Sequence, residues 1–391
     1  MNIAYILNAT IANGGATKAF LNMLDGVMQY GVKPFVVVPD KDGVYSELQK
    51  RHIPTLVVTY RPCAYPYFNT MKQRLMFIPK LAARIIVNHK ATNILTAWLK
   101  ENVIDIVHSN TGVVRIGFDA ARKMGIPHIY HIREYRDLDF GMNYFPTSKT
   151  FYQQLEKPNS YTICITKDIQ YYHKQCGRDV SKVIYDGVLS KMPAMPVGQH
   201  KDYFLFAGRI QPAKGLRELL EAYRSYICKE GHPLKLKVAG SNGDDAYYQS
   251  QLKFVKDNGL TTFVEFLGNR NDITTLMREA RALIVSSPFE GFGFSMPEAM
   301  QQGCLVIGRN TSGTKEQLDN ALEMTGQEIA LRYETTEQLA SLLSEVANHP
   351  TSHYDNYTRT AFDIVNQLYT KENHAKKVYD YYINILNGKS N

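Results

Sequence analysis

The sequence predicts an α/β protein with two domains, each built on a doubly wound parallel sheet. The chain has 391 residues, which is more than one hydrophobic core usually serves. Short apolar, β-branched runs alternate with helical patterns in both halves, as in parallel sheets flanked by helices. Between the halves, residues 189–200 (LSKMPAMPVGQH) contain two prolines and no periodicity, which predicts an interdomain linker.

The expected strands follow one another along each half. In the first domain, residues 1–190, they are NIAYIL, KPFVVVPD, TLVVTY, DIVHSN, HIYHI, YTICIT and KVIYD. In the second, residues 200–391, they are YFLFAGRI, LKLKVAG, FVEFLG, ARALIVSS and CLVIGR. The chain is expected to be helical from Thr336 onward, with its last helix a candidate to pack back on the first domain. Because such sheets bind ligands at the carboxyl ends of their strands, we expect the two domains to face each other across a cleft.

Composition excludes several protein classes. The chain is 44% hydrophobic and 21% charged, as in ordinary globular proteins, and no apolar run approaches the length of a membrane-spanning helix. The start, MNIAYILNA, shows no secretory signal, so a cytoplasmic protein is expected. The five cysteines never occur as CxxC, so they are expected to be small buried hydrophobes rather than disulfide partners or zinc ligands.

Positive charge is concentrated in the first half. Residues 1–200 contain 24 Lys and Arg against 14 Asp and Glu, and the span from Arg51 to Lys100 has eight basic residues and no acidic one. Mixed with aromatic residues, this span fits contact with an anionic membrane surface at the inner face of the cell membrane. The alternative is a solvated helix face. No pattern resembles a nucleic-acid-reading module, so no nucleic acid partner is expected.

Two glycine-containing loops each lie between a strand and a helix. In the first, Gly14 and Gly15 allow close approach of a ligand to the helix N-terminus, although the loop is not GxGxxG. In the second, AGRIQPAKG, Arg209 and Lys214 are expected to converge on one pyrophosphate. For either loop alone, an ordinary tight connection or a pair of solvated side chains is an alternative.

The segment SSPFEGFGFSMPEAM combines two carboxylates with a glycine-rich loop. Glu290 and Glu298 lie eight residues apart, and a helix is expected to begin near Met296. Loop amides can bind a sugar or phosphate, and carboxylates can accept hydrogen bonds from sugar hydroxyls. No spacing typical of metal ligands accompanies them, so neither a metal nor another cofactor is expected.

Over nearly its whole length the chain resembles the retaining glycosyltransferases of family 4, which have the GT-B fold of two facing Rossmann-like domains. The resemblance rests on Gly14-Gly15, VHSN, YHIRE, VIYDGV, AGRIQPAKG, LKVAG, VEFLG, SSPFEGFGFSMPEAMQQGCLVIG and SGTKEQ. The chain departs from the family pattern at Ser312-Gly313, where Gly-Gly is commoner, and at Asp186, where Asn is frequent.

The resemblance implies roles for individual residues. Glu290 would face the donor sugar and Glu298 the ribose hydroxyls, while Arg209 and Lys214 would hold the diphosphate. Gly15 would approach the donor from the first domain, and Arg270 would lie at the base pocket. The backbone amides of the glycine-rich loop would bind the sugar and the diphosphate; these are the amides of Gly291, Phe292, Gly293 and Phe294.

His131 is the candidate catalytic residue of the first domain. It ends the strand HIYHI, so it is expected to project into the cleft and to hydrogen-bond the donor sugar or stabilise charge in the transition state. Arg133 and Glu134 are candidate acceptor contacts, and His108 is expected to be structural.

We therefore expect a metal-independent, retaining hexosyl- or N-acetylhexosaminyl-type glycosyltransferase. It would move a sugar from a nucleoside diphosphate sugar, UDP-linked by preference, to a glycan or lipid-linked acceptor in polysaccharide or glycoconjugate synthesis. Two alternatives remain: a nucleotide-sugar epimerase on the same fold, and a sugar-nucleotide-binding protein with a degenerate site.

Overall fold

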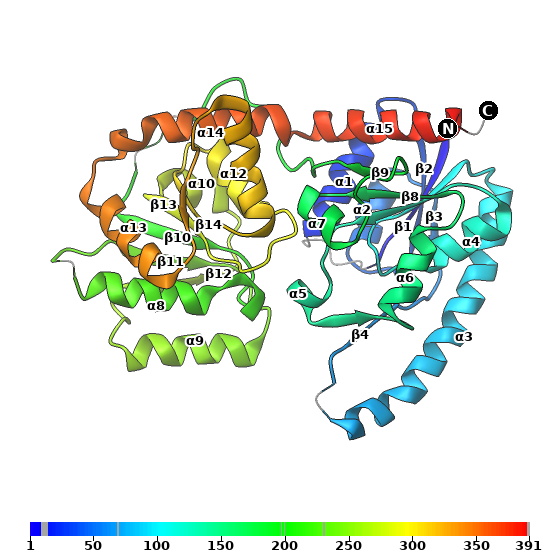
Figure 1. Cartoon of the computed structure of the whole chain (residues 1–391), viewed down its shortest axis with the longest axis horizontal. Helices are drawn as coiled ribbons and strands as arrows, with labels where there is room; N and C mark the ends of the chain where they lie inside the picture. Colours follow the sequence, from blue (N-terminus) through cyan, green and yellow to red (C-terminus); the bar gives the residue numbers. More distant parts are fainter. Residues whose placement is uncertain (9–14, 69, 197, 199, 230, 389–391) are drawn as a thin grey trace. The chain divides into compact units, whose positions relative to one another are not determined.

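A computed structural model describes residues 1–8, 15–68, 70–196, 198, 200–229 and 231–388. The chain divides into two compact units, residues 1–187 with 371–391, and residues 188–370. The division at Gly187 precedes the linker expected at residues 189–200. The last segment, which the sequence numbered with the second domain but whose helix was a candidate to pack back on the first, belongs to the first unit (Figure 1).

The first unit contains a seven-stranded parallel sheet in the order β3-β2-β1-β5-β6-β8-β9. Its strands are β1 (Asn2–Ile6), β2 (Lys33–Val38), β3 (Thr55–Val57), β5 (Ile106–Ser109), β6 (His128–Ile132), β8 (Ser160–Cys164) and β9 (Ser181–Val183). All seven expected strands are therefore confirmed. A short antiparallel pair, β4 (Ala64–Pro66) and β7 (Met142–Tyr144), was not expected.

Helices cover both faces of this sheet because side chains alternate along each strand. On β1, Ile3 and Tyr5 pack toward α1 and α15, whereas Ala4 and Ile6 pack toward the end of α3 and α4. The helices of this unit are α1 (Gly15–Met28), α2 (Val44–Lys50), α3 (Met71–Glu101), α4 (Ile116–Met124), α5 (Asp137–Phe140), α6 (Ser148–Leu155), α7 (Lys167–Tyr172) and α15 (Lys371–Asn387).

Helix α15 is an integral part of the first unit. Its buried face, which includes Ala375, Val378 and Tyr382, joins the same core as α1. Gly26 of α1 lies against Ala375 so closely that a Cβ added at Gly26 would be 2.4 Å from the Ala375 Cβ. The two helices therefore meet where the sequence supplies a glycine and an alanine.

The second unit contains a six-stranded parallel sheet in the order β12-β11-β10-β13-β14-β15. Its strands are β10 (Tyr203–Ala207), β11 (Lys235–Ala239), β12 (Val264–Gly268), β13 (Ala282–Val285), β14 (Val306–Arg309) and β15 (Leu331–Tyr333). The first five confirm the expected strands, and β15 was not expected. Phe204, Phe206 and Leu236 pack against α8 and α13 in its core.

The helices of the second unit are α8 (Leu216–Ile227), α9 (Asp245–Asp257), α10 (Ile273–Glu279), α11 (Ser295–Gln301), α12 (Ser312–Thr325), α13 (Thr336–Asn348) and α14 (Asp355–Leu368), with 3-10 turns η1 (Pro212–Lys214) and η2 (Thr351–Tyr354). Helix α13 begins at Thr336, where helix was expected. Thr335 caps it by accepting a hydrogen bond from the Gln338 amide.

The cysteines form no disulfide, but the expectation that they are buried was wrong for two of them. Cys63, Cys164 and Cys304 are buried, whereas Cys176 and Cys228 are exposed. In the part of the chain that the structure describes, no helix is long and apolar enough to cross a membrane.

Candidate active site

In each sheet the chain adds strands toward one edge and then, from a neighbouring strand, toward the other edge. This switch lies between β1 and β5 in the first unit and between β10 and β13 in the second. Ligands of doubly wound sheets bind beyond the carboxyl ends of strands at such a switch point. Lys214 follows β10 and Glu290 follows β13, so the topology alone brings these two residues to the switch point of the second unit.

Lys214 and Glu290 contact each other directly. The Lys214 Nζ donates to both carboxylate oxygens of Glu290, at 2.8 and 2.7 Å. Their side chains keep 25% and 15% of their surface exposed, so the pair is held in place but remains accessible to a ligand. The predicted diphosphate-binding and sugar-facing residues thus form one charged pair.

A glycine brings the loop of Lys214 against the end of β13. Gly215 has a φ of +66°, and a Cβ added there would lie 2.0 Å from the Ser286 carbonyl oxygen. The Ser286 hydroxyl also donates to the Lys214 carbonyl, at 3.0 Å. Since no larger residue fits this approach, Gly215 fixes the position from which Lys214 reaches Glu290.

The loop after Glu290 is fastened to the start of α12. The Gly313 amide donates to the Glu290 carbonyl at 2.9 Å, and a Cβ at Gly313 would lie 2.6 Å from that oxygen and 2.7 Å from the Gly291 oxygen. The buried Gln317 side chain donates to the Phe292 carbonyl and, at 3.4 Å, to that of Gly293. Gly313, the glycine that the sequence keeps where Ser312 replaces the first one of Gly-Gly, is therefore needed for this close approach.

Three other predicted donor-binding residues of the second unit, Arg209, Arg270 and Glu298, lie on separate segments. Arg209 is exposed after β10 and makes no hydrogen bond or ion pair with the described residues. Arg270 is exposed after β12 and binds Asp272 at 2.8 and 2.7 Å. Glu298 lies half-buried in α11. The expected convergence of Arg209 and Lys214 on one pyrophosphate stays a prediction.

In the first unit, Gly14 lies outside the described residues. Gly15 is the exposed first residue of α1, the helix that follows the switch-point strand β1 in the chain. The Asn110 side chain, which follows β5, donates to the Ala16 carbonyl at 3.4 Å. This contact joins the start of α1 to the buried polar cluster around His131 and Arg133.

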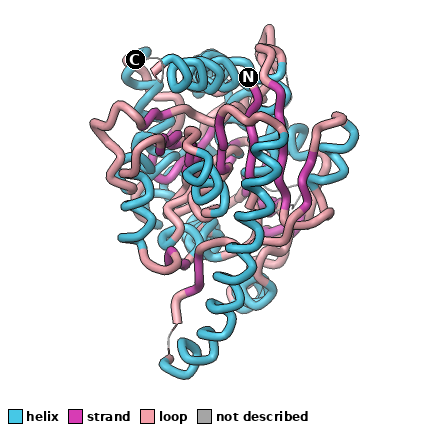
Figure 2. Tube along the Cα trace, turned by 90° about the vertical axis from the view of Figure 1, so that its right-hand side faces the viewer, coloured by secondary structure: helices cyan, strands magenta, loops and turns pink. Residues whose placement is uncertain are grey.

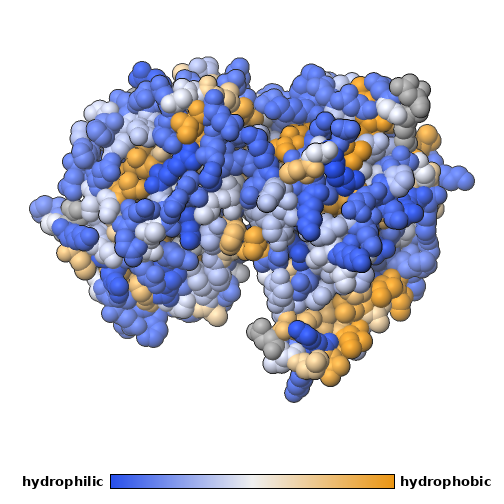
Figure 3. All heavy atoms as spheres, in the orientation of Figure 1, coloured by the Kyte–Doolittle hydropathy of each residue, from blue (hydrophilic) through white to orange (hydrophobic). Residues whose placement is uncertain are grey.

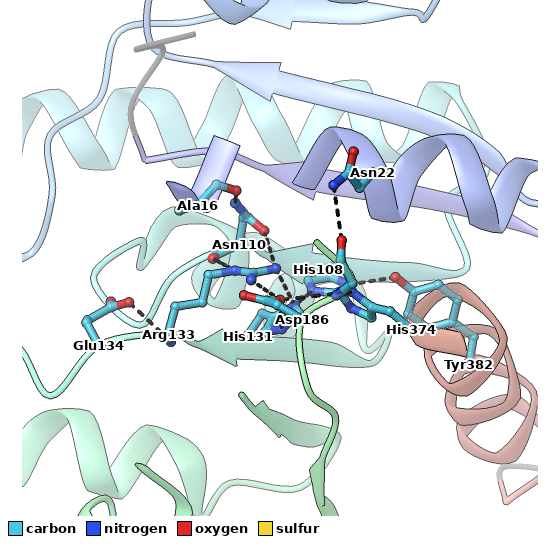
Figure 4. A network of polar contacts seen from close by, with 11 residues as sticks. Ala16, Asn22, His108, Asn110, His131, Arg133, Glu134, Asp186, His374 and Tyr382 are labelled. Carbon is cyan, nitrogen blue, oxygen red and sulfur yellow. Dashed lines mark hydrogen bonds and ion pairs between the residues drawn. The ribbon is translucent and has the colours of Figure 1, made fainter. Parts of the chain in front are cut away.

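His131, at the end of β6, belongs to a buried polar cluster rather than to an open surface (Figure 4). Its Nδ1 lies 3.1 Å from the His108 Nε2 and 3.2 Å from an Arg133 guanidinium nitrogen. His108 in turn contacts the Tyr382 hydroxyl through its Nδ1, at 2.7 Å. The His131 Nε2 has no hydrogen-bond partner among the described residues.

These contacts determine which imidazole nitrogens are protonated. A guanidinium can only donate, so the His131 Nδ1 accepts and its proton is on Nε2. His108 must then donate from Nε2 and accept on Nδ1 from Tyr382. Burial, followed by the nearby Arg133 charge, lowers the pKa of His131 and of His108 well below the usual value. His131 is therefore a neutral imidazole whose Nε2–H makes no hydrogen bond with the described residues, although an Asp186 carboxylate oxygen lies 3.9 Å from it.

Arg133 and Asp186 form a buried ion pair beside His131, with Arg133 donating to the Asp186 carboxylate. Arg133 also donates to the Asn110 carbonyl and side-chain oxygens, each at 3.3 Å. Arg133 was expected to contact the acceptor, but it is buried by these contacts. Asp186 is the second departure from the family pattern, and its carboxylate balances the positive charge of the Arg133 guanidinium.

Among the described residues, His131, Asp186 and His374 form a group whose ligand atoms lie within 4.8 Å of one another. The Asp186 carboxylate is bound by Arg133, and the His374 Nδ1 accepts the Gly187 amide at 2.7 Å. A cation would compete with these donors for the same lone pairs. The group is therefore arranged as a hydrogen-bonding cluster.

Glu134 is also buried rather than available for an acceptor. Its carboxylate accepts from the amides of Gly112, at 3.0 Å, and Arg133, at 3.2 Å. Burial raises its pKa to about 7. Glu134 thus fastens the loop after β5 to the loop after β6.

Four residues whose contacts the sequence did not predict surround His131 and the neighbouring His108. Arg133 and Asp186 are buried charges, and His374 and Tyr382 come from α15, more than 240 residues further along the chain than His131. The only sequence signal was a histidine and a tyrosine on the apolar face of the last helix. The expected structural role of His108 agrees with its position between Tyr382 and His131.

Residues 192–361 match the family model described as "Glycosyl transferases group 1". The match includes every donor-binding residue predicted in the second unit. A curated relative from Escherichia coli, named UDP-Gal:alpha-D-GlcNAc-diphosphoundecaprenol alpha-1,3-galactosyltransferase, is 29% identical over 61% of this chain and 67% of its own. The uncharacterized glycosyltransferase YqgM of Bacillus subtilis is 34% identical over 28% of this chain. The chain spans only 30% of YqgM.

Solved structures resemble the chain over almost its full length. The structure of Anabaena HepE in complex with UDP has a TM-score of 0.75 at 18% identity, covering 97% of this chain and 99% of HepE. The galactosyltransferase WaaB, in its apo form, has a TM-score of 0.70 at 17% identity over the whole of both chains. These likenesses confirm the GT-B type of α/β fold expected from the sequence.

Proposed function

We propose that the chain is a glycosyltransferase that takes a sugar from a nucleoside diphosphate sugar and retains its anomeric configuration. The observation that carries this proposal is the Lys214–Glu290 pair at the switch point of the second sheet. A cation can bind the diphosphate there, while a carboxylate beside it accepts hydrogen bonds from sugar hydroxyls. Both residues lie within the part that matches the glycosyltransferase model.

The proposed donor is a UDP-sugar with a hexosyl or N-acetylhexosaminyl group, and the acceptor a hydroxyl of a glycan or lipid-linked glycan. The relative from Escherichia coli is named for a UDP-sugar donor and a diphosphoundecaprenol-linked acceptor. HepE was crystallised with UDP. These names support the choice of donor and acceptor class for this chain.

The proposed chemistry needs no covalent enzyme intermediate. The bond between the anomeric carbon and the diphosphate oxygen breaks, and a bond to the acceptor oxygen forms on the same face. The acceptor proton passes to the leaving diphosphate, whose charge Lys214 and Arg209 stabilise.

A thermal-shift screen with UDP, GDP, ADP and their sugars tests donor binding. A ligand that binds only the folded state raises the unfolding temperature. We expect UDP and one or more UDP-sugars to do so, and the absence of any shift with every nucleotide would contradict the proposal.

We also propose that transfer is independent of a divalent metal, because the predicted diphosphate contacts are cationic side chains and loop amides. Activity should be unchanged by EDTA. Activity lost in EDTA and restored by manganese would show that a metal holds the diphosphate instead.

A further inference from the structure

The long helix α3 leaves most of its length unburied. From Met71 to Lys90 no residue is buried, and the buried residues begin at Ala91. Figures 1 and 2 show this part of the helix extending away from the sheet of its unit, and Figure 3 shows apolar side chains over it. Only the last three turns of α3 therefore contribute to the core.

The exposed part has an apolar stripe. Met71, Leu75, Ile78, Ile85 and Ile86 keep 68, 60, 55, 56 and 57% of their surface exposed. Their spacing, completed by Ala82, places them on one side of a helix at 100° per residue. The stripe is about 22 Å long at 1.5 Å per residue. Exposed apolar surface of this extent is typical of an interaction site.

Positive charge surrounds the stripe. Lys72 and Lys90 lie on one flank of it, and Arg74 lies on the other. No acidic residue occurs between Arg51 and Lys100, and none of these three basic side chains forms an ion pair with a described carboxylate. The positive charge is therefore available to a partner.

We propose that residues 71–90 of α3 bind an anionic phospholipid surface, with the apolar stripe in the acyl region and the basic flanks among the headgroups. A helix with this distribution lies in the plane of the interface. A second copy of the same stripe would meet like charges, which disfavours self-association. No described helix can cross a membrane, so the contact is peripheral.

This inference rests on the proposed function in one respect: it names the surface at which a lipid-linked acceptor would be met. An anionic surface of this kind is found on the cytoplasmic leaflet of cell membranes. Lipid binding itself requires neither donor nor acceptor, so it can be measured separately from transfer.

Co-sedimentation of the full chain with vesicles tests the proposal. The chain should bind vesicles of phosphatidylcholine with phosphatidylglycerol, bind pure phosphatidylcholine vesicles far less, and dissociate in high salt. Because each basic side chain near the surface contributes about fivefold in affinity, K72Q/R74Q/K90Q should weaken partitioning about a hundredfold. The variant L75Q/I78Q/I85Q should also weaken partitioning onto anionic vesicles, and its remaining binding should keep the salt dependence of the wild type.

Matched controls remove the same groups elsewhere. K229Q/K235Q/K256Q lowers the charge equally at exposed positions of the second unit, and L322Q/M324Q replaces exposed apolar residues of α12. Both should bind vesicles as the wild type does. Equal loss in these controls, or equal binding to neutral and anionic vesicles, would overturn the proposal.

Sedimentation velocity without lipid addresses self-association. A dimer that L75Q/I78Q/I85Q converts to a monomer would assign the stripe to a second copy and overturn the lipid proposal. Nucleotide thermal shifts recorded on the same variants separate the lipid proposal from the proposed function. Vesicle binding can fail while UDP still stabilises the chain, and UDP can fail to stabilise the chain while vesicle binding persists.

Discussion

At the scale of single residues, the two sheets carry different groups at the edge where the carboxyl ends of their strands lie. The second unit presents an accessible ion pair, Lys214–Glu290, and the first presents a neutral imidazole, His131, whose Nε2 has no partner among the described residues. A buried N–H donor without a partner is costly. An Asp186 carboxylate oxygen, 3.9 Å from this Nε2, partly offsets that cost through its charge.

Replacing Lys214 by Ala should weaken binding of the nucleoside diphosphate about 10- to 100-fold, since a hydrogen bond to a charged group is worth about 1.5–3 kcal/mol. Arg209→Ala should also weaken it, without loss of stability, because Arg209 is exposed. Calorimetric titration measures both. Lys253→Ala, which removes an exposed lysine of α9, is the control, and unchanged affinity in the first two variants would place the diphosphate elsewhere.

The tautomer of His131 is a second residue-scale prediction. Nitrogen-15 NMR should show its proton on Nε2 in the wild type. Tyr382→Phe removes the donor to the His108 Nδ1, so the preference for that tautomer should fall. Tyr381→Phe is the matched control, because the Tyr381 hydroxyl donates to the Val180 carbonyl and does not contact the histidines. A proton on the His131 Nδ1 of the wild type would contradict the hydrogen-bond assignment.

Sequence patterns predicted which residues lie at strand ends, because such positions follow directly from the apolar runs. They did not predict burial or pairing. Arg133 and Glu134 follow β6 as expected, yet both are buried by contacts with residues from other segments, such as Asp186 and Gly112. Contacts of this kind depend on tertiary packing and leave no local periodicity.

At the scale of elements, glycines set how closely the loops approach. Gly313→Ala places a Cβ within 2.7 Å of two carbonyl oxygens of the Glu290 loop. We expect the loop to move, with a loss of about 1–3 kcal/mol in the free energy of unfolding and weaker nucleotide binding. Gly231→Ala, where nothing lies within 4 Å, should change neither. Chemical denaturation and calorimetry measure the two effects, and normal behaviour of Gly313→Ala would show that the loop is not fixed by α12.

The long strands were predictable because they are buried on both faces and therefore continuously apolar. The short strands β4, β7 and β15 were not predicted, whereas β3 and β9, which are equally short, were predicted because they lie in the longer apolar runs TLVVTY and KVIYD. The packing of α15 on α1 depends on the meeting of Gly26 and Ala375, a pairing across the chain that neither helix shows alone.

At the scale of the whole molecule, the first unit should lose stability in acid. Burial lowers the pKa of five of its histidines: His108, His128, His131, His173 and His374. Below the unfolded-state pKa of 6.5 the unfolded chain binds protons that the folded chain does not. The free energy of unfolding therefore falls with pH, by up to about 1.4 kcal/mol per pH unit for each histidine.

Three carboxyl groups act in the opposite direction. Burial raises the pKa of Glu134 to about 7 and that of Asp139 to about 6, and it also raises the pKa of Asp119, so their folded forms bind protons first as the pH falls. Five histidines outweigh three carboxyls, and we expect a net loss of several kcal/mol between about pH 6.5 and pH 5. Hydrogen exchange, which resolves the two units, should show the first opening earlier in acid; equal or greater protection at the lower pH would contradict this.

Proton NMR of the chain incubated with UDP-sugars tests the central claim most directly. Transfer to water or to an acceptor should release UDP, and the sugar should first appear with the anomeric configuration of the donor and its other centres unchanged. A sugar altered at a ring carbon would instead support the epimerase. Failure to release a nucleoside diphosphate from any donor that stabilises the chain would contradict the assignment of glycosyl transfer.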